Sequence, residues 1–249
     1  MLHTLKTYIQ QRFKPAVFFP LAVYLVAYAQ PDFENAGDVF KSFFIISFLL
    51  FGFRLFDDLW SREHDILKVN RDYVQPENFV LLRQFLIGYL AFLLCAVWLL
   101  KTEIAVAFVI FTALNIAAYF TLFKKRKWSF ILPLLKYPFL CFLLFAFFKN
   151  GESLLTQVLI PASLLPAFLL FEVFDDEEFS FKSWVIFSIF LVGNLLLFCA
   201  NQASVFAPFF AAIGVIIFAL ILKDKTRLKT ILPYAILIYF LILRVLVQL

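Results

Sequence analysis

The sequence predicts an all-α membrane protein, a polytopic bundle of about nine transmembrane helices. Of its 249 residues, 64% are hydrophobic and only 16% are charged, so there are too few polar side chains to cover a water-facing surface. The apolar runs are continuous and about twenty residues long, which is the length of a helix that crosses a bilayer. Strands of a membrane barrel would instead alternate apolar and polar residues.

Nine apolar segments are expected to form the spans. They run over residues 15–30, 40–56, 79–100, 104–123, 128–148, 154–174, 184–200, 205–222 and 230–249. The stretches between them are too short to hold a soluble domain. We therefore expect a single transmembrane domain over residues 1–249.

The placement of lysine and arginine predicts the orientation. Of the 22 such residues, four are assigned to helix ends that would face outside, namely Lys41, Lys101, Lys149 and Arg244. Arg83 and Lys136 lie further inside their spans and are not assigned to a side. The other sixteen lie on the same side as the N-terminus, which the positive-inside rule assigns to the cytoplasm. The short loops favour a bacterial inner membrane. This rule also explains the basic run Lys124–Lys127, so no nucleic-acid partner is expected.

Acidic residues gather in two stretches, 54–72 and 172–178, which follow the second and sixth spans. Both stretches are expected on the cytoplasmic side. Glu172 and Asp176 are four residues apart and share one face of a helix, as do Asp58 and Asp65 if the second helix continues through them. A carboxylate at the depth of Glu172 is costly in a membrane and marks a candidate functional site.

This pattern of charge favours a magnesium diphosphate site. Mg²⁺ takes oxygen ligands and is typically bound by one or two carboxylates together with substrate phosphates. Basic residues close to the two stretches would neutralise the remaining phosphate charge. They are Arg62, Lys68, Arg71 and Lys124. The lipid tail of the substrate would then run among the helices.

These features resemble the UbiA-type intramembrane prenyltransferase superfamily. That family carries Asn-Asp-x-x-Asp-x-x-x-Asp after the second span and Asp-x-x-x-Asp after the sixth. Here the first stretch reads Asp57-Asp58-Leu-Trp-Ser61-Arg62-Glu-His-Asp65 and the second reads Glu172-Val-Phe-Asp-Asp176. Tyr119 followed by Lys124 also resembles the basic loop that the family has after its fourth span. The chain departs from the family at Asp57, Ser61 and Glu172.

The resemblance implies Mg²⁺-dependent transfer of a prenyl group from a prenyl diphosphate to a hydrophobic acceptor, either aromatic or lipid. It implies four catalytic, metal-binding carboxylates: Asp58, Asp65, Glu172 and Asp176. The implied substrate-binding residues are Asp57, Ser61, Arg62, Lys68, Tyr119 and Lys124.

Two alternatives to catalysis stay open. Ser61 stands where the family has its central aspartate, so the chain is also interpreted as a lipid-binding protein or transporter that uses the same cavity without chemistry. A catalytically inactive scaffold is the other alternative. Within the spans, Asn115 and Asn194 are expected to bond between helices. The Lys136 side chain is expected to reach toward the cytoplasmic surface, with direct phosphate binding as the alternative.

Overall fold

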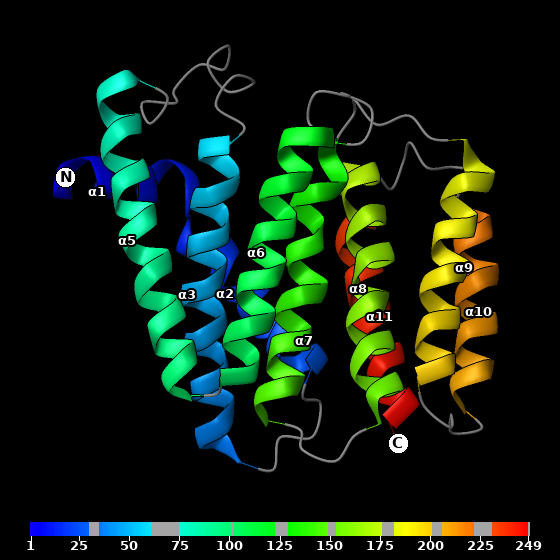
Figure 1. Cartoon of the computed structure of the whole chain (residues 1–249). Coiled ribbons are helices and arrows are strands. Elements are labelled where there is room, and N and C mark those ends of the chain that lie inside the picture. The colour runs from blue at the N-terminus through cyan, green and yellow to red at the C-terminus, as the bar shows by residue number, and fades with distance from the viewer. Residues whose placement is uncertain are drawn as a thin grey trace. The chain divides into compact units, whose positions relative to one another are not determined.

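The computed structural model describes residues 1–29, 35–60, 75–100, 102–122, 129–148, 153–175, 182–200, 206–221 and 231–248. Within them every element is a helix, which confirms the all-α prediction for the described part of the chain (Figure 1). The helices are α1 (Leu2–Arg12), α2 (Pro15–Ala29), α3 (Ala36–Trp60), α5 (Pro76–Leu100), α6 (Thr102–Leu122), the 3₁₀ helix η2 (Ser129–Leu135), α7 (Lys136–Phe148), α8 (Leu154–Asp175), α9 (Ser183–Ala200), α10 (Phe206–Ile221) and α11 (Leu232–Gln248).

Eight of the nine expected segments each overlap one helix, and the segment 128–148 covers both η2 and α7. Two differences matter for the site. Helix α3 runs to Trp60, four residues beyond the expected end, and so carries Asp57 and Asp58 in its last turns. Helix α1 was not expected, because it is polar and short and a search for apolar runs passes over it.

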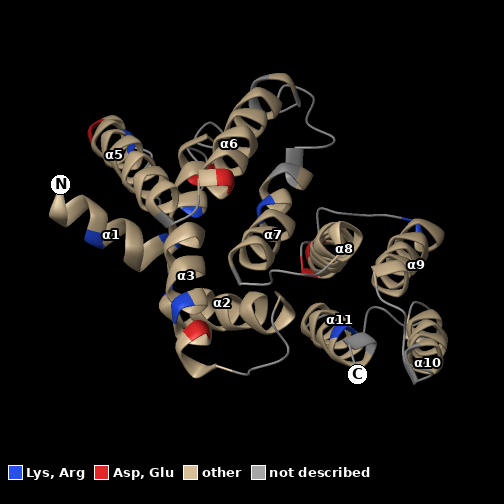
Figure 2. Ribbon diagram, turned by 60° about the horizontal axis from the view of Figure 1, so that its bottom comes forward, with Lys and Arg blue, Asp and Glu red and all other residues tan. Residues whose placement is uncertain are grey.

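Among the described residues, four helices are long and apolar enough to cross a membrane, namely α3, α5, α8 and α9. Helices α1 and α2 add a fifth if this pair, bent by 70°, is counted as one span. Shorter apolar stretches lie in α6, α7, α10 and α11. Figure 2 shows how few charged residues the described helices carry. These helices support a multi-pass membrane protein, and the count of nine spans stays a prediction.

The chain divides into two compact units. The first contains Met1–Leu25 and Asn35–Pro133, and the second contains Val26–Glu34 and Leu134–Leu249. In the first unit α5 packs against α1, α3 and α6. Gly52 lets α5 approach α3 closely, since an added Cβ atom would lie 3.1 Å from the Tyr89 ring. The Tyr89 hydroxyl donates a hydrogen bond to the Phe48 carbonyl at 2.9 Å.

In the second unit α8 packs against α7, α9 and α11, while α10 packs against α9 and α11. A glycine again allows a close approach, because a Cβ atom on Gly193 would lie 2.6 Å from the Phe240 ring. The last turn of α2 belongs to this unit, and the Tyr28 and Ser163 hydroxyls share a hydrogen bond of 2.5 Å. Helix α8 is thus the centre of the unit and carries the second acidic stretch at its end.

Candidate functional site

Two carboxylates are buried at the end of α3. Asp57 is 9% exposed and Asp58 only 2% exposed. A buried charge is costly unless it is paired and accepts hydrogen bonds. The contacts of Asp58 therefore decide how this end of the helix is held.

Asp58 is the centre of an ion-pair cluster. Arg12 donates from Nη2 to Oδ1 at 2.6 Å and from Nε to Oδ2 at 3.0 Å, which is a bidentate pairing. The Tyr8 hydroxyl donates to Oδ2 at 2.9 Å. Arg54, one turn earlier on α3, places its Nε 3.2 Å from Oδ2 as a second ion pair. Asp57 lies within electrostatic reach of Arg54. The cluster thus joins α1 to α3.

Helix α1 supplies its partners at a regular spacing. Thr4, Tyr8 and Arg12 are four residues apart and lie on one face of the helix. The Thr4 hydroxyl donates to the Asn78 side chain at 3.1 Å, so the same face also contacts α5. The sequence contains a signal for this face, because these three positions repeat at helical spacing before Pro15. Apolar periodicity missed it, since the face is polar.

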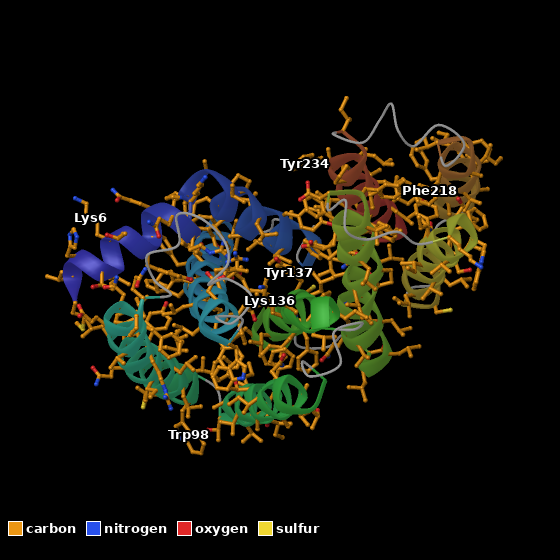
Figure 3. All side chains as sticks on the ribbon, turned by 90° about the horizontal axis from the view of Figure 1, so that it is seen from above. Lys6, Trp98, Lys136, Tyr137, Phe218 and Tyr234 are labelled. Carbon is orange, nitrogen blue, oxygen red and sulfur yellow. The ribbon has the colours of Figure 1, made fainter. Side chains whose placement is uncertain are left out.

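The second acidic stretch begins inside the last turn of α8. Glu172 is half-buried and Asp175, the last residue of the helix, is exposed. One turn before Glu172, the Phe168 ring stacks on Tyr137 of α7 at 3.9 Å between ring centroids. Figure 3 shows Lys136 and Tyr137 beside each other at the start of α7.

Lys136 is more deeply buried than the sequence predicts. It is 5% exposed, and its Nζ lies 5.3 Å from the centroid of the Tyr137 ring. The expectation that the side chain reaches the surface is therefore wrong, because the start of α7 is covered by its packing against α8. A cation buried among apolar helices is a candidate functional residue in a membrane protein.

An apolar cavity of about 130 Å³ lies among α9, α10 and α11 of the same unit. Its lining residues are Phe190, Gly214, Ile217, Phe218, Ile221, Leu232, Ala235, Ile236 and Tyr239. The lining residue Phe218 contacts the end of α8, where it meets Phe174 edge to face with 6.2 Å between ring centroids. Tyr234 of α11, which is not a lining residue, meets Phe171 of α8 with 5.6 Å between ring centroids (Phe218 and Tyr234 are labelled in Figure 3).

The cavity has a neutral polar pair at one side. The Tyr239 hydroxyl donates to the Asn194 side-chain oxygen at 2.5 Å, and the Asn194 amide donates to the Phe190 carbonyl at 2.8 Å. The expected role of Asn194 as a partner between helices is confirmed. Asn115 instead donates to the Phe111 carbonyl of its own helix at 2.9 Å. With these groups paired to each other, the cavity presents hydrocarbon and aromatic surface to an occupant.

A buried arginine lies elsewhere in the second unit. Arg244 is 1% exposed, and its guanidinium carbon lies 5.9 Å from the centroid of the Phe145 ring. Its place in the sequence predicts an outer helix end and no function. It marks a second polar position among apolar helices.

The structure describes only some of the predicted site residues. Asp57 and Asp58 belong to the first unit, and Glu172 belongs to the second. Tyr119 lies on α6, but its side chain is outside the described residues. The remaining predicted residues also lie outside the described residues: Ser61, Arg62, Asp65, Lys68, Lys124 and Asp176.

The predicted Mg²⁺ ion fits poorly at Asp58. Two guanidinium groups already neutralise this carboxylate. Its Oδ2 atom accepts hydrogen bonds from Tyr8 and Arg12 and lies 3.2 Å from the Arg54 Nε as an ion pair. Glu172 and Asp175 are oxygen ligands of the kind Mg²⁺ takes. Among the described residues, no three histidines, cysteines or acids gather closely enough to hold a metal ion.

Comparisons of the chain with protein-family models, with curated proteins and with solved structures gave no match. The resemblance to the UbiA-type superfamily therefore stays a prediction from the sequence.

Proposed function

We propose that the protein transfers a prenyl group from a prenyl diphosphate to a hydrophobic acceptor within the membrane. The observation that supports this most is that the acidic end of α8 lies close to the apolar cavity in the same unit. Phe174, between Glu172 and Asp175, contacts Phe218 of the cavity lining. A prenyl diphosphate matches both surfaces. Its diphosphate would bind the acidic helix end through a metal ion, and its hydrocarbon tail would bind the apolar cavity.

Mg²⁺ is the cofactor that this proposal requires. When bound, it would neutralise charge on the diphosphate as that group leaves. Glu172 offers a ligand on α8, and Asp65 and Asp176 are the predicted ligands outside the described residues. Arg62, Lys68 and Lys124 are predicted to bind the phosphates, together with substrate contacts from Asp57, Ser61 and Tyr119.

The surroundings of the cavity suit the transfer step. The bond between the prenyl carbon and the diphosphate oxygen breaks, a bond from that carbon to the acceptor forms, and the acceptor loses a proton. The lining is apolar and offers few hydrogen-bond partners to water, which would otherwise capture the electron-poor carbon. Aromatic faces such as Phe190 and Phe218 stabilise positive charge by about 1–2 kcal/mol when desolvated.

The experiment that tests the proposal is a titration of the purified protein with geranylgeranyl diphosphate, with and without Mg²⁺. Thermal unfolding reports binding, since a ligand at a hundred times its dissociation constant raises stability by about 2.7 kcal/mol. We expect stabilisation that depends on Mg²⁺ and is lost in Glu172→Gln. Glu103→Gln is the matched control, because Glu103 is an exposed glutamate in the first turn of α6.

Turnover is measured with a radiolabelled prenyl diphosphate and a membrane lipid extract as the source of acceptor. Release of diphosphate together with a labelled, extractable product supports transfer. If neither Mg²⁺ nor the diphosphate group affects binding, the proposal fails.

The cavity also suits a lipid-binding protein or transporter without chemistry, and the serine at position 61 favours this second candidate. It predicts that geranylgeraniol, which has the same tail without the diphosphate, binds as well as the diphosphate does. It also predicts that no diphosphate is released.

A further inference from the structure

We propose that Asp58 is a positioning residue that clamps α1 across the end of α3, and that guanidinium groups take the place of a metal ion at its carboxylate. This inference is independent of prenyl transfer. It concerns the described residues of the first unit alone and assigns a function to α1, which the sequence motifs do not include.

Helix α1 needs such a clamp. It has 11 residues, and a helix of this length is marginal in water without tertiary contacts. Its axis turns by 70° from that of α2. Because α1 does not continue along the axis of α2, side-chain contacts must hold it in place. Thr4, Tyr8 and Arg12 provide these contacts.

Burial shows which of these contacts is the anchor. Asp58 has a side chain that is 3% exposed, whereas the Arg12 side chain is 17% exposed. The carboxylate thus lies inside, and α1 brings the cation to it. Tyr8, fully buried, donates to the same carboxylate and fixes its rotamer. The bidentate pairing sets the position of the Arg12 guanidinium plane as well as its distance.

The same contacts oppose a metal ion. Mg²⁺ demands a nearly octahedral set of oxygen ligands and retains several waters. At Asp58 it would lie beside the guanidinium groups of both Arg12 and Arg54, whose positive charges repel a dication. A metal ion would have to displace Arg12 and so release α1. Clamping and metal binding at Asp58 therefore exclude each other.

A spin label on α1 tests the clamp directly. Lys6 is exposed on this helix (Figure 3), so Lys6→Cys provides the attachment point. The exposed Cys95 and Cys199 are replaced by serine, while the buried Cys141 is retained. We expect an immobile nitroxide in the full-length protein, a mobile one in Asp58→Asn, and an immobile one in the control Asp38→Asn, which changes an exposed carboxylate in the first turn of α3.

Substitutions at the other end of the clamp keep the test decisive if Asp58→Asn does not fold. Arg12→Gln removes the ion pair, and Arg12→Lys retains the charge without the bidentate geometry. We expect the label to be most mobile in Arg12→Gln and partly restrained in Arg12→Lys. An equally immobile label in both variants would overturn the clamp.

Mn²⁺, a paramagnetic substitute for Mg²⁺, tests the second half of the proposal. Adding it to the labelled protein should leave the α1 label immobile. Any Mn²⁺ dissociation constant should change by less than about twofold in Asp58→Asn, because the proposal has Asp58 neither bind the ion nor orient a group that binds it. A rise of about tenfold or more, or release of α1 by Mn²⁺, would show that Asp58 helps to hold the metal ion and would overturn the proposal.

Discussion

At the scale of single residues, the pairing of Asp58 with two arginines explains why a carboxylate can be buried at the end of α3. Its carboxylate would be costly there alone, and Arg12 and Arg54 offset that cost with charge-assisted hydrogen bonding and ion pairing. Such a pair gains little stability over an apolar contact. Removing one partner is nevertheless destabilising, because it leaves the other charge buried and uncompensated.

Asp58→Asn should therefore lower the free energy of unfolding by about 2–3 kcal/mol, somewhat less than for a fully buried pair because Arg12 and Arg54 are partly exposed. Thermal unfolding in detergent measures the loss. Asp38→Asn is the control, since the Asp38–Lys41 pair is exposed and should be worth less than about 1 kcal/mol. Equal effects of the two substitutions would show that Asp58 carries no buried ion pair.

The hydrogen bond between Tyr239 and Asn194 makes a second prediction at this scale. Tyr239→Phe keeps the ring in the cavity wall but leaves the buried Asn194 oxygen without this donor. We expect a loss of about 1 kcal/mol, in the range of hydrogen bonds between membrane helices. Tyr234→Phe is the control, because Tyr234 is 59% exposed. Unchanged unfolding in Tyr239→Phe would contradict the prediction.

At the scale of helices, glycine positions determine how closely neighbours approach. Gly193 on α9 faces the Phe240 ring of α11, and the Cβ atom of Pro166 lies 3.1 Å from where a Gly193 Cβ would be. Phe240 is fully buried, so its ring has little freedom to move away. This contact keeps α8, α9 and α11 together in the second unit.

Gly193→Ala should destabilise the protein by about 1–3 kcal/mol, because the added methyl group overpacks the contact with Phe240. Gly88→Ala is a matched control on another apolar helix. A Cβ atom there would meet nothing within 4 Å, so only the gain in helix propensity of up to about 1 kcal/mol remains. Unfolding measurements on both variants should move in opposite directions, and destabilisation by both would contradict the packing argument.

At the scale of the whole molecule, the number of spans is the main open prediction. Nine spans with a cytoplasmic N-terminus place residues 126, 178 and 226 inside and residues 151 and 202 outside. Reporter domains fused after these positions, active on only one side of the membrane, test this pattern. If 126 and 151 report the same side, α7 does not cross the membrane and the carboxylate stretches no longer share a face.

The sequence by itself determined the all-α class and the positions of the apolar helices. Apolar runs of span length leave the backbone no other way to satisfy its hydrogen bonds in lipid. It also identified the acidic stretches, because isolated charges stand out in so apolar a chain.

Only the tertiary structure decided which groups meet Asp58. Arg12 and Tyr8 are 46 and 50 residues away along the chain, so no local pattern records their contact. The burial of Lys136 and the joining of the α9–α10–α11 cavity to the end of α8 are likewise consequences of packing between helices. Periodicity gives the face that a helix buries, whereas the choice of partner for that face depends on how the whole chain folds.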